Sequence, residues 1–177
     1  MDAHTSAHST KTGSASSPHQ AQMDAIDKML ARLELSPDGQ ILDANPRFLA
    51  LMNYSLDELK GQHHEVLLSR DEAQSPSYTA FWEALRSGQP QEGEFHRLDK
   101  QGRDVWTLGT CSPILDAQGK LIRIIEYAMD LTEQKQLNAN FEGQINALSR
   151  VMGKVEFSLD GTILDANSRF LDIMGYQ

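Results

Sequence analysis

The sequence predicts an α+β domain: a five-stranded antiparallel sheet with helices on one face, flanked by a helix at each end. Short alternating segments separated by turn residues predict two strands before residue 45 and three strands after residue 90. Helix-start signals fill the interval between them. A third observation, an internal repeat, predicts that a second copy of the domain begins near residue 154.

Composition excludes several classes of protein. The chain of 177 residues carries a formal net charge of −9, whereas a nucleic-acid-binding surface needs clustered Lys and Arg. No apolar run approaches the roughly 18 residues that span a membrane, and the first twenty residues lack the apolar core of a secretory signal. The single cysteine, Cys111, excludes an internal disulfide and is typical of a reducing compartment. We therefore expect a cytoplasmic protein that contacts neither nucleic acid nor membrane.

The amino-terminal part is expected to change from disorder to order near residue 21. Residues 1–20 are rich in Ser, Thr, Ala and His, so they cannot bury enough apolar surface to offset the entropy of ordering. Apolar residues then recur at helix spacing from Met23, which predicts a flanking helix over residues 21–31. Alternating residues on both sides of a Pro-Asp-Gly turn predict a β-hairpin that begins the domain at residue 32.

Helix signals fill the interval between the two groups of strands. Asn45 is a good N-cap, and the proline after it suits the first helical position. Ser55 begins a Ser-Leu-Asp-Glu capping box. Ser75 precedes another proline and a longer amphipathic helix that Gly88 ends. Residues 62–74 lack regular spacing, so we expect irregular helix and loop there.

The three later strands are expected to pair as antiparallel hairpins. Residues 93–98, 105–114 and 121–129 have strand-like composition, and short turns rich in Asp and Gly separate them. The predicted order is therefore two strands, several helices and three strands.

A long polar helix is predicted after the last strand, over residues 133–153. The four residues before it, Asp130-Leu131-Thr132-Glu133, have the form of a capping box. Apolar residues follow at steps of four, four, three and four, which makes one stripe suited to pairing with a partner helix: Leu137, Phe141, Ile145, Leu148 and Met152.

The internal repeat is the strongest long-range signal. A shift of 122 residues aligns residues 22–54 with 144–176, and 16 of the 33 aligned positions are identical. Duplication of a domain explains this similarity. Residues 154–177 would supply only the first hairpin of the second copy, and a two-stranded hairpin is marginal alone. We expect this piece to be unstable without a partner, and the natural protein to be longer.

Together, the element order, the Asp-Gly hairpin, the Asp-Ala-Asn helix start and the closing Asp-Leu-Thr-Glu resemble the PAS domain family. The resemblance covers residues 32–132 as a complete domain and 154–177 as a truncated second one. Segments 61–64 and 75–85 are similar to soluble tandem-PAS chemoreceptors of the aerotaxis and biofilm-dispersion type. In those proteins the PAS domains precede a cytoplasmic methyl-accepting signalling domain. The resemblance therefore implies a chemotaxis or energy-taxis sensor whose output domain lies outside this chain.

The same resemblance implies a flavin, FAD, in the pocket between sheet and helices. Redox-sensing PAS domains that bind flavin carry a Trp on the long helix and a Glu seventeen residues earlier, and Trp82 and Glu65 match that spacing. Two other family positions depart from the pattern, because Arg97 and Thr107 stand where flavin-binding domains carry Asn. An inward Arg favours an anionic or carboxylate partner instead.

Strand alternation predicts which side chains share the pocket face. Thr107 is grouped with Val105, Gly109 and Cys111, and Arg97 with Phe95. By analogy with the family's register, the last strand is expected to direct four side chains to the pocket: Ile122, Ile124, Glu126 and Ala128. A carboxylate is costly in an apolar pocket unless it is paired, so we hypothesise an ion pair between Glu126 and Arg97. The apolar outer face is expected to consist of Leu121, Ile125, Tyr127 and Met129.

Alternative interpretations remain for several of these residues. Trp82 is compatible with simple core packing, and Glu65 with an exposed charge at a helix end. His63 and His64 are candidate ligands for haem b, because haem iron often takes a proximal His. The checklist of nucleophile, base, phosphate loop and metal-ligand spacing finds no enzyme site.

The leading functional hypothesis is a redox or oxygen sensor that uses FAD. Its signal would pass along the last strand, through Asp130 and Thr132, into the 133–153 helix. Two rivals are a haem-based gas sensor and a cofactor-free module for dimerisation or protein interaction. In each case a homodimer through the flanking helices and the outer sheet face is expected.

Overall fold

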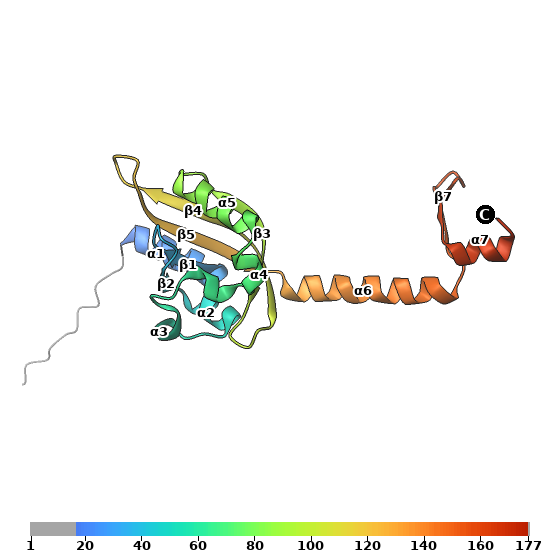
Figure 1. Ribbon diagram of the computed structural model, residues 1–177, viewed down its shortest axis with the longest axis horizontal. Helices are drawn as coiled ribbons and strands as arrows, with labels where there is room; N and C mark the ends of the chain where they lie inside the picture. Colours follow the sequence, from blue (N-terminus) through green and yellow to red (C-terminus); the bar gives the residue numbers. More distant parts are fainter. Residues whose placement is uncertain (1–16, 177) are drawn as a thin grey trace, which may run out of the picture.

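The computed structural model describes residues 17–176, apart from the side chain of His19. Most of the predicted disordered tail, and Gln177, lie outside the described residues. One sheet-and-helix body holds residues 18–130, and a long helix leads away from it to a hairpin and a short helix (Figure 1). No helix between residues 17 and 176 is long and apolar enough to cross a membrane.

The predicted five-stranded antiparallel sheet is confirmed. Its strand order is β2-β1-β5-β4-β3, so β5 joins the first hairpin to the last two strands. The strands are β1 (Ala31–Leu35), β2 (Ile41–Ala44), β3 (Gln91–Leu98), β4 (Asp104–Leu115) and β5 (Leu121–Asp130).

Capping residues set the helix boundaries. The side chains of Ser17, Asn45 and Ser75 accept hydrogen bonds from backbone N–H groups at the starts of α1, α2 and α5, each followed by Pro. Because Ser17 caps it, α1 begins three residues before the predicted start. The helices of the first body are α1 (Pro18–Met29), α2 (Pro46–Met52), α3 (Leu56–Leu59), α4 (Arg70–Ala73) and α5 (Pro76–Arg86), with a 3-10 turn, η1 (His64–Leu67), before α4.

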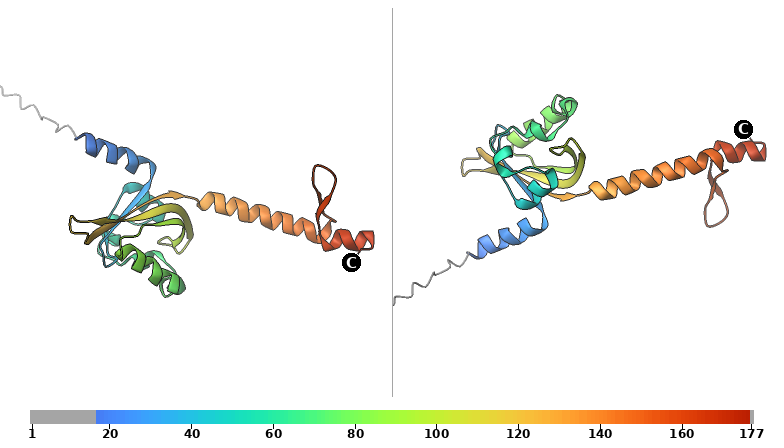
Figure 2. Two further views of the ribbon diagram at one scale, coloured as in Figure 1. Left: turned by 90° about the horizontal axis from the view of Figure 1, so that it is seen from above. Right: turned by 90° about the horizontal axis from the view of Figure 1, so that it is seen from below.

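The core lies between the sheet and the helices that follow β2. Fully buried apolar side chains come from both, and they include Leu33, Leu35, Ile41, Phe48, Met52, Leu59, Leu67, Leu85 and Ile124. Helix α1 lies on the opposite side of the sheet from α5 (Figure 2). The two faces of the sheet are therefore different: one covers the core and one is open beside α1.

The start of β5 corrects one predicted face assignment. Ile122, expected in the pocket, is 47% exposed, whereas Leu121, expected outside, packs against the core. Between Ile114 and Leu115 the partner on β5 changes from Arg123 to Leu121, so Ile122 is an extra residue in the ladder. Such a bulge reverses which side chains face inward beyond it. The other inward residues of β4 and β5 lie as predicted.

The duplication is visible in the structure, because in both copies an Asn side chain forms the same joint between a preceding helix, the first strand and the following helix. Asn45 accepts hydrogen bonds from the backbone N–H groups of Arg32 and Phe48, at 3.0 and 2.9 Å, and its amide nitrogen donates to carbonyl oxygens at the end of α1. Asn167 repeats this with Lys154 and Phe170, at 2.8 and 2.9 Å, and with carbonyls at the end of α6 (Thr132–Val151). The end of α6 therefore has the same position relative to the second copy as the end of α1 has relative to the first copy.

The second copy forms its local structure without a core. Its elements are β6 (Val155–Phe157), β7 (Ile163–Ala166) and α7 (Ser168–Met174), and β6 and β7 pair only with each other. Ile41 is fully buried, while its equivalent Ile163 is 58% exposed. The described part of the second copy therefore has little apolar burial to stabilise it.

Candidate functional site

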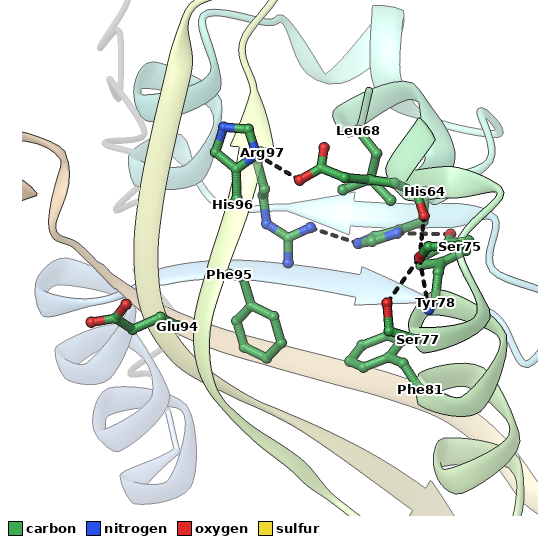
Figure 3. Close-up of a pocket in the computed structure, with 11 residues that line it drawn as sticks. His64, Leu68, Ser75, Ser77, Tyr78, Phe81, Glu94, Phe95, His96 and Arg97 are labelled. Carbon is green, nitrogen blue, oxygen red and sulfur yellow. Dashed lines mark hydrogen bonds and ion pairs between the residues drawn. The ribbon is translucent and has the colours of Figure 1, made fainter. Parts of the chain in front are cut away.

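A cavity of about 300 Å³ lies between β3 and the segment from η1 to α5. Leu68, Tyr78, Phe81 and Phe95 form its apolar wall (Figure 3). Two buried polar side chains reach it, Arg97 from β3 and His64 from η1. The remaining lining residues are polar: Glu72, Ser75, Ser77, Glu94 and His96.

The predicted ion pair between Arg97 and Glu126 is present beneath this cavity. Nη2 of Arg97 donates to both carboxylate oxygens of Glu126 at 2.7 Å. Both side chains are buried, with exposed fractions of 2% and 0%. A buried ion pair is costly to desolvate, and it holds only because each charge compensates the other. The interior thus contains one cation and one anion in contact.

His64 extends this network to the cavity wall. Nη1 of Arg97 donates to Nε2 of His64 at 2.7 Å, and a guanidinium has no acceptor, so Nε2 must carry the lone pair. The proton is therefore on Nδ1, which donates to the hydroxyl of Tyr78 at 3.1 Å. Burial, and then the charge of Arg97, hold the pKa of His64 well below its usual value. His64 is accordingly neutral, with both ring nitrogens occupied (Figure 3).

The two residues that suggested a flavin lie outside the cavity lining. Trp82 is 4% exposed and packs edge-on against Tyr78 and Phe81, behind the aromatic wall. Its indole Nε1 is buried without a hydrogen-bond partner among the described residues. The side chain of Glu65 is 52% exposed and lies 3.5 Å from a ring nitrogen of His63. The spacing of two residues along the sequence does not determine whether their side chains point into the cavity.

Thr107 and Ala128 are buried on the predicted face but support the sheet. The hydroxyl of Thr107 lies 3.5 Å from the carbonyl oxygen of Phe95, across the β3–β4 pair. Ala128 lies opposite Gly109, where a Cβ would come within 2.4 Å of the carbonyl oxygen of Tyr127. Only glycine fits this close approach. Neither Thr107 nor Ala128 lines the cavity.

His96 bridges the two walls of the cavity, a role that no sequence pattern predicts. Its Nδ1 lies 2.6 Å from Glu72 on α4 and its Nε2 lies 2.8 Å from Asp104 at the start of β4. Burial acts to lower the pKa of His96, but the hydrogen bonds to these two carboxylates outweigh it and raise the pKa. The protonated ring therefore ties α4, β3 and β4 together.

Trp106 connects this bridge to the start of α6. The His96 ring lies 4.7 Å from one ring of Trp106, and Nζ of Lys135, in the first turns of α6, lies 5.0 Å from it. Lys135 also pairs with Glu94 of the cavity lining at 2.5 Å. Cavity and helix are thus joined in two ways, through the Trp106 side chain and through the ion pair between Glu94 and Lys135.

Asp130 and Thr132, which are predicted to transfer a signal, take part in the hydrogen bonds at the start of α6. Thr132 Oγ1 accepts from the backbone N–H of Trp106 at 3.0 Å, and the N–H of Leu131 donates to the carbonyl of Trp106 at 2.8 Å. Asp130 accepts from the backbone N–H of Thr132 at 2.8 Å. These bonds fix the first turn of α6 to β4.

The bridge predicts a pH-dependent contribution to stability. The charged groups that face His96 are Glu72 from α4, Asp104 from β4 and, across Trp106, Lys135 from α6. Because the folded pKa of His96 is raised, its contribution is complete below about pH 6.5 and is lost as pH rises through the folded value. We expect the free energy of unfolding of the wild type to exceed that of His96→Gln by about 1 kcal/mol at about pH 6, and by a smaller amount at about pH 9. Urea unfolding at both pH values measures this.

Because the wild type and His96→Gln carry the same other histidines, the difference between their free energies of unfolding reports on His96 alone. An excess stability that stays constant or grows with pH would show that His96 is not held protonated by these carboxylates.

Comparison with known proteins supports the same fold and a sensory role. The family model described as PAS fold matches residues 23–136. Biofilm dispersion protein BdlA of Pseudomonas aeruginosa is 42% identical over 154 residues, which is 87% of this chain and 37% of that protein. Oxygen sensor protein DosP of Escherichia coli is 25% identical over 125 residues, or 71% of this chain and 15% of that protein. The chain thus spans well under half the length of these relatives.

Solved structures share the architecture at low sequence identity. A PAS domain from Colwellia psychrerythraea, 22% identical, superimposes with a TM-score of 0.58 over 65% of this chain and 98% of its own. An RNA-binding light-oxygen-voltage receptor, 21% identical, gives 0.60 over 82% of this chain and 42% of its own. At these identities the likeness concerns the fold alone. The family model that matches residues 23–136 shows that this chain belongs to the PAS domain family.

Proposed function

We propose that this chain is the sensory part of a cytoplasmic signal-transduction protein of the chemoreceptor type. The cavity of the first PAS domain takes up a ligand, and α6 carries the resulting change to the second copy. One observation supports this most directly: Glu94 and His96 belong to the cavity lining, and both contact the start of α6 through Lys135 and Trp106.

The energy needed for such a signal is available in these contacts. A ligand that moves the cavity wall disturbs the hydrogen bond between His96 and Glu72, and with it the tilted ring contact between His96 and Trp106. Loss of such a partly exposed charged hydrogen bond is worth about 1 kcal/mol or less. That amount changes a two-state equilibrium by up to about five-fold. The joint at Asn167 then holds the far end of α6 to the second copy.

The described residues do not fit FAD, the ligand that the family resemblance implies. A bound flavin would supply a ring whose redox state changes its hydrogen bonding. The cavity of about 300 Å³ lies at the lower limit for small-molecule pockets, which is too small to enclose a dinucleotide. Arg97 and His64 occupy the floor, while Trp82 and Glu65 lie outside the lining. A redox or oxygen signal through FAD therefore finds no support in this geometry.

Haem b meets a similar obstacle. His64 reaches the cavity, but Arg97 and Tyr78 occupy both of its ring nitrogens. His96 is engaged in the same way by Glu72 and Asp104. Iron ligation by either side chain requires a charged hydrogen bond to break, so we favour a ligand that leaves both histidines in place.

We further propose that two chains associate through the flanking helices and the outer sheet face. The apolar stripe of α6 is exposed along its length, at Leu137, Phe141, Ile145, Leu148 and Met152. A stripe with this spacing is buried most simply by the same stripe of a second copy. Such a dimer also serves a cofactor-free module, the second candidate function. Sedimentation velocity tests the association, and the output is proposed to lie in a downstream signalling domain outside this chain.

Hydrogen exchange of the α6 start tests the proposed route. We expect the amides of residues 131–136 to exchange about five- to ten-fold faster in His96→Gln, because the Glu72–His96–Trp106 contacts no longer hold the joint. His63→Gln is the matched control, since the His63 ring contacts the turn carbonyl of Asp38 and Glu65 of η1 rather than the start of α6. Equal exchange at 131–136 in wild type and His96→Gln would contradict the route.

A further inference from the structure

Strand β3 is an outer strand of the sheet, and four consecutive residues of it, 94–97, line the cavity. Neighbouring side chains of a strand point to opposite faces, so these four residues reach one cavity only around the edge of the strand. Phe95 and Arg97 direct their side chains inward, toward α5 and β5 (Figure 3). Glu94 and His96 direct theirs to the other face, toward the start of α6 and β4. The cavity therefore includes the backbone edge of β3.

Two hydrogen bonds show which backbone groups of β3 lie at this edge. In an antiparallel pair, residues that exchange backbone hydrogen bonds alternate with residues that do not. The carbonyl of Trp106 on β4 accepts from the first N–H after β5 at 2.8 Å, so Trp106 bonds toward β5 and not toward His96 opposite it. Where the β3–β4 pair ends, the N–H of Asp99 donates to the carbonyl of Arg103 at 3.0 Å, which gives the same alternation. The N–H and carbonyl groups of Glu94 and His96 therefore point away from β4.

These edge groups lack a strand to pair with. Within residues 17–176, β3 pairs only with β4, and no backbone hydrogen bond outside the sheet uses Glu94 or His96. Unpaired N–H and carbonyl groups of an edge strand are a template for a further strand. A ligand that pairs with both residues needs alternating donors and acceptors at strand spacing, which is the property of an extended peptide.

The two faces of β3 specify the side chains of such a peptide. All strand pairs of this sheet are antiparallel, which is also the slightly more stable arrangement. A peptide residue opposite Phe95 directs its side chain into the cavity, toward Tyr78 and Phe81, so an apolar side chain fits there. The next peptide residue lies opposite Glu94, on a strand that also exposes Glu92, so a basic side chain complements it.

His96 limits the length of the peptide. Its ring lies 2.6 Å from the carboxylate of Glu72, and this bridge joins β3 to α4 across the open side of the edge. A long strand of a partner protein would have to displace the bridge, whereas a short peptide whose first residue is small ends beside it. The cavity of about 300 Å³ likewise has room for an apolar side chain and not for a folded partner.

We infer that this cavity binds a short free peptide, added antiparallel to the outer edge of β3, with an apolar residue in the cavity and a basic residue opposite Glu94. This inference rests on the proposed sensory role of the cavity and names the class of its ligand. The carboxylate of Glu94 also holds Lys135 at the start of α6. A basic residue of the peptide therefore competes with Lys135, which connects occupancy of the cavity to the proposed route.

NMR titration of the full chain with the peptide Ac-Gly-Leu-Lys-NH2 tests the pairing. Its Gly, Leu and Lys are expected to lie opposite His96, Phe95 and Glu94. We expect saturable binding with a Kd on the order of 1 mM for so short a peptide. The amide protons of Glu94 and His96 are expected to show the largest downfield shifts, because they gain an acceptor. Those of Phe95 and Arg97, which already bond to β4, should shift less.

N-methylated peptides test the backbone bonds separately from the side chains. In the proposed pairing the N–H of the peptide Lys donates to the carbonyl of Glu94, whereas the N–H of the peptide Leu points away from β3. N-methylation of the Lys is therefore expected to weaken binding about ten-fold or more, and N-methylation of the Leu, the matched control, less than about two-fold. Replacing the peptide Leu by Ser, or the Lys by Glu, is expected to weaken binding about five-fold.

A variant pair tests the basic position from the side of the protein. Glu94→Gln keeps the shape of the side chain and removes its charge, so the affinity for Ac-Gly-Leu-Lys-NH2 is expected to fall about two- to five-fold. Glu133→Gln is the matched control, because it removes the same charge from the first turn of α6, outside the cavity lining; its affinity should equal that of the wild type. Circular dichroism verifies that both variants are folded.

Three results of these titrations overturn the inference: no saturable binding, equal losses from the two N-methylated peptides, or unchanged affinity in Glu94→Gln. Two further results overturn it by naming another occupant. If extending the peptide at its amino end tightens binding about ten-fold or more, the edge belongs to a strand of a partner protein. If the amide protons of Glu94 and His96 shift downfield with protein concentration alone, the edge belongs to a second copy of this chain.

The ligand class and the sensory role can fail separately. If the peptide binds as expected but residues 131–136 show no shift, the ligand class stands and the sensory function fails. If no peptide binds but the exchange of residues 131–136 responds to His96→Gln, the proposed route stands and the ligand class fails.

Discussion

Replacing Glu126 by Ala is expected to destabilise the first PAS domain by about 3–5 kcal/mol. The carboxylate is fully buried and forms both of its hydrogen bonds with Arg97. Without it the guanidinium keeps its charge inside the protein and has only neutral His64 as a side-chain partner. Urea denaturation followed by tryptophan fluorescence measures the loss, since both tryptophans, Trp82 and Trp106, lie in this domain.

The cause of this loss can be separated from simple loss of packing. The double variant Arg97→Met, Glu126→Met removes both charges and fills similar volume, so its stability is expected to lie close to that of the wild type. Glu133→Ala removes a carboxylate that is exposed at the start of α6 and should change stability by less than about 0.5 kcal/mol. A double variant as unstable as Glu126→Ala would show that the pair itself, rather than an unpaired charge, stabilises the fold.

This ion pair was predictable from the family resemblance together with strand alternation. The family's register assigns Glu126 on β5 to the pocket, and Arg97 on β3 stands at a position where the family carries a pocket Asn. Alternation then groups their neighbours on the same face. Two opposite charges on one buried face have to meet or be neutralised. The rest of the network was not predictable in this way. His64, Tyr78 and Arg97 come from η1, α5 and β3, and their contact depends on how those elements pack.

The fold itself follows from local signals with one exception. Caps, turns and repeated alternation each identify an element from a few neighbouring residues, as Asn45 and Ser75 do for α2 and α5. The bulge at Ile122 has no such signature, because an extra residue in a strand is defined only by its partner across the ladder. Likewise, the seventeen-residue spacing between Glu65 and Trp82 matches a pattern of the family, but a spacing does not determine which side of η1 or α5 faces the cavity.

The duplication allows a second large effect to be predicted with an internal control. Ile41→Ala is expected to destabilise the first domain by about 2–5 kcal/mol, because a fully buried side chain is replaced by a cavity. Ile163→Ala makes the same change in the same local structure, the second strand of the repeated hairpin. Its side chain is 58% exposed, so we expect a change within about 0.5 kcal/mol.

The comparison tests whether the same side chain in the same local sequence contributes differently to stability in the two copies. Ile41 and Ile163 share the flanking Leu-Asp-Ala-Asn, so propensity and turn chemistry are matched, and only the packing partners differ. Fluorescence-detected urea unfolding reports on the first domain, and hydrogen exchange of β6 and β7 reports on the second. Equal destabilisation by the two variants would mean that the second hairpin is packed as tightly as the first. A large effect for Ile41 alone would show that the sheet completed by β3, β4 and β5, rather than the hairpin sequence, stabilises the sensory domain.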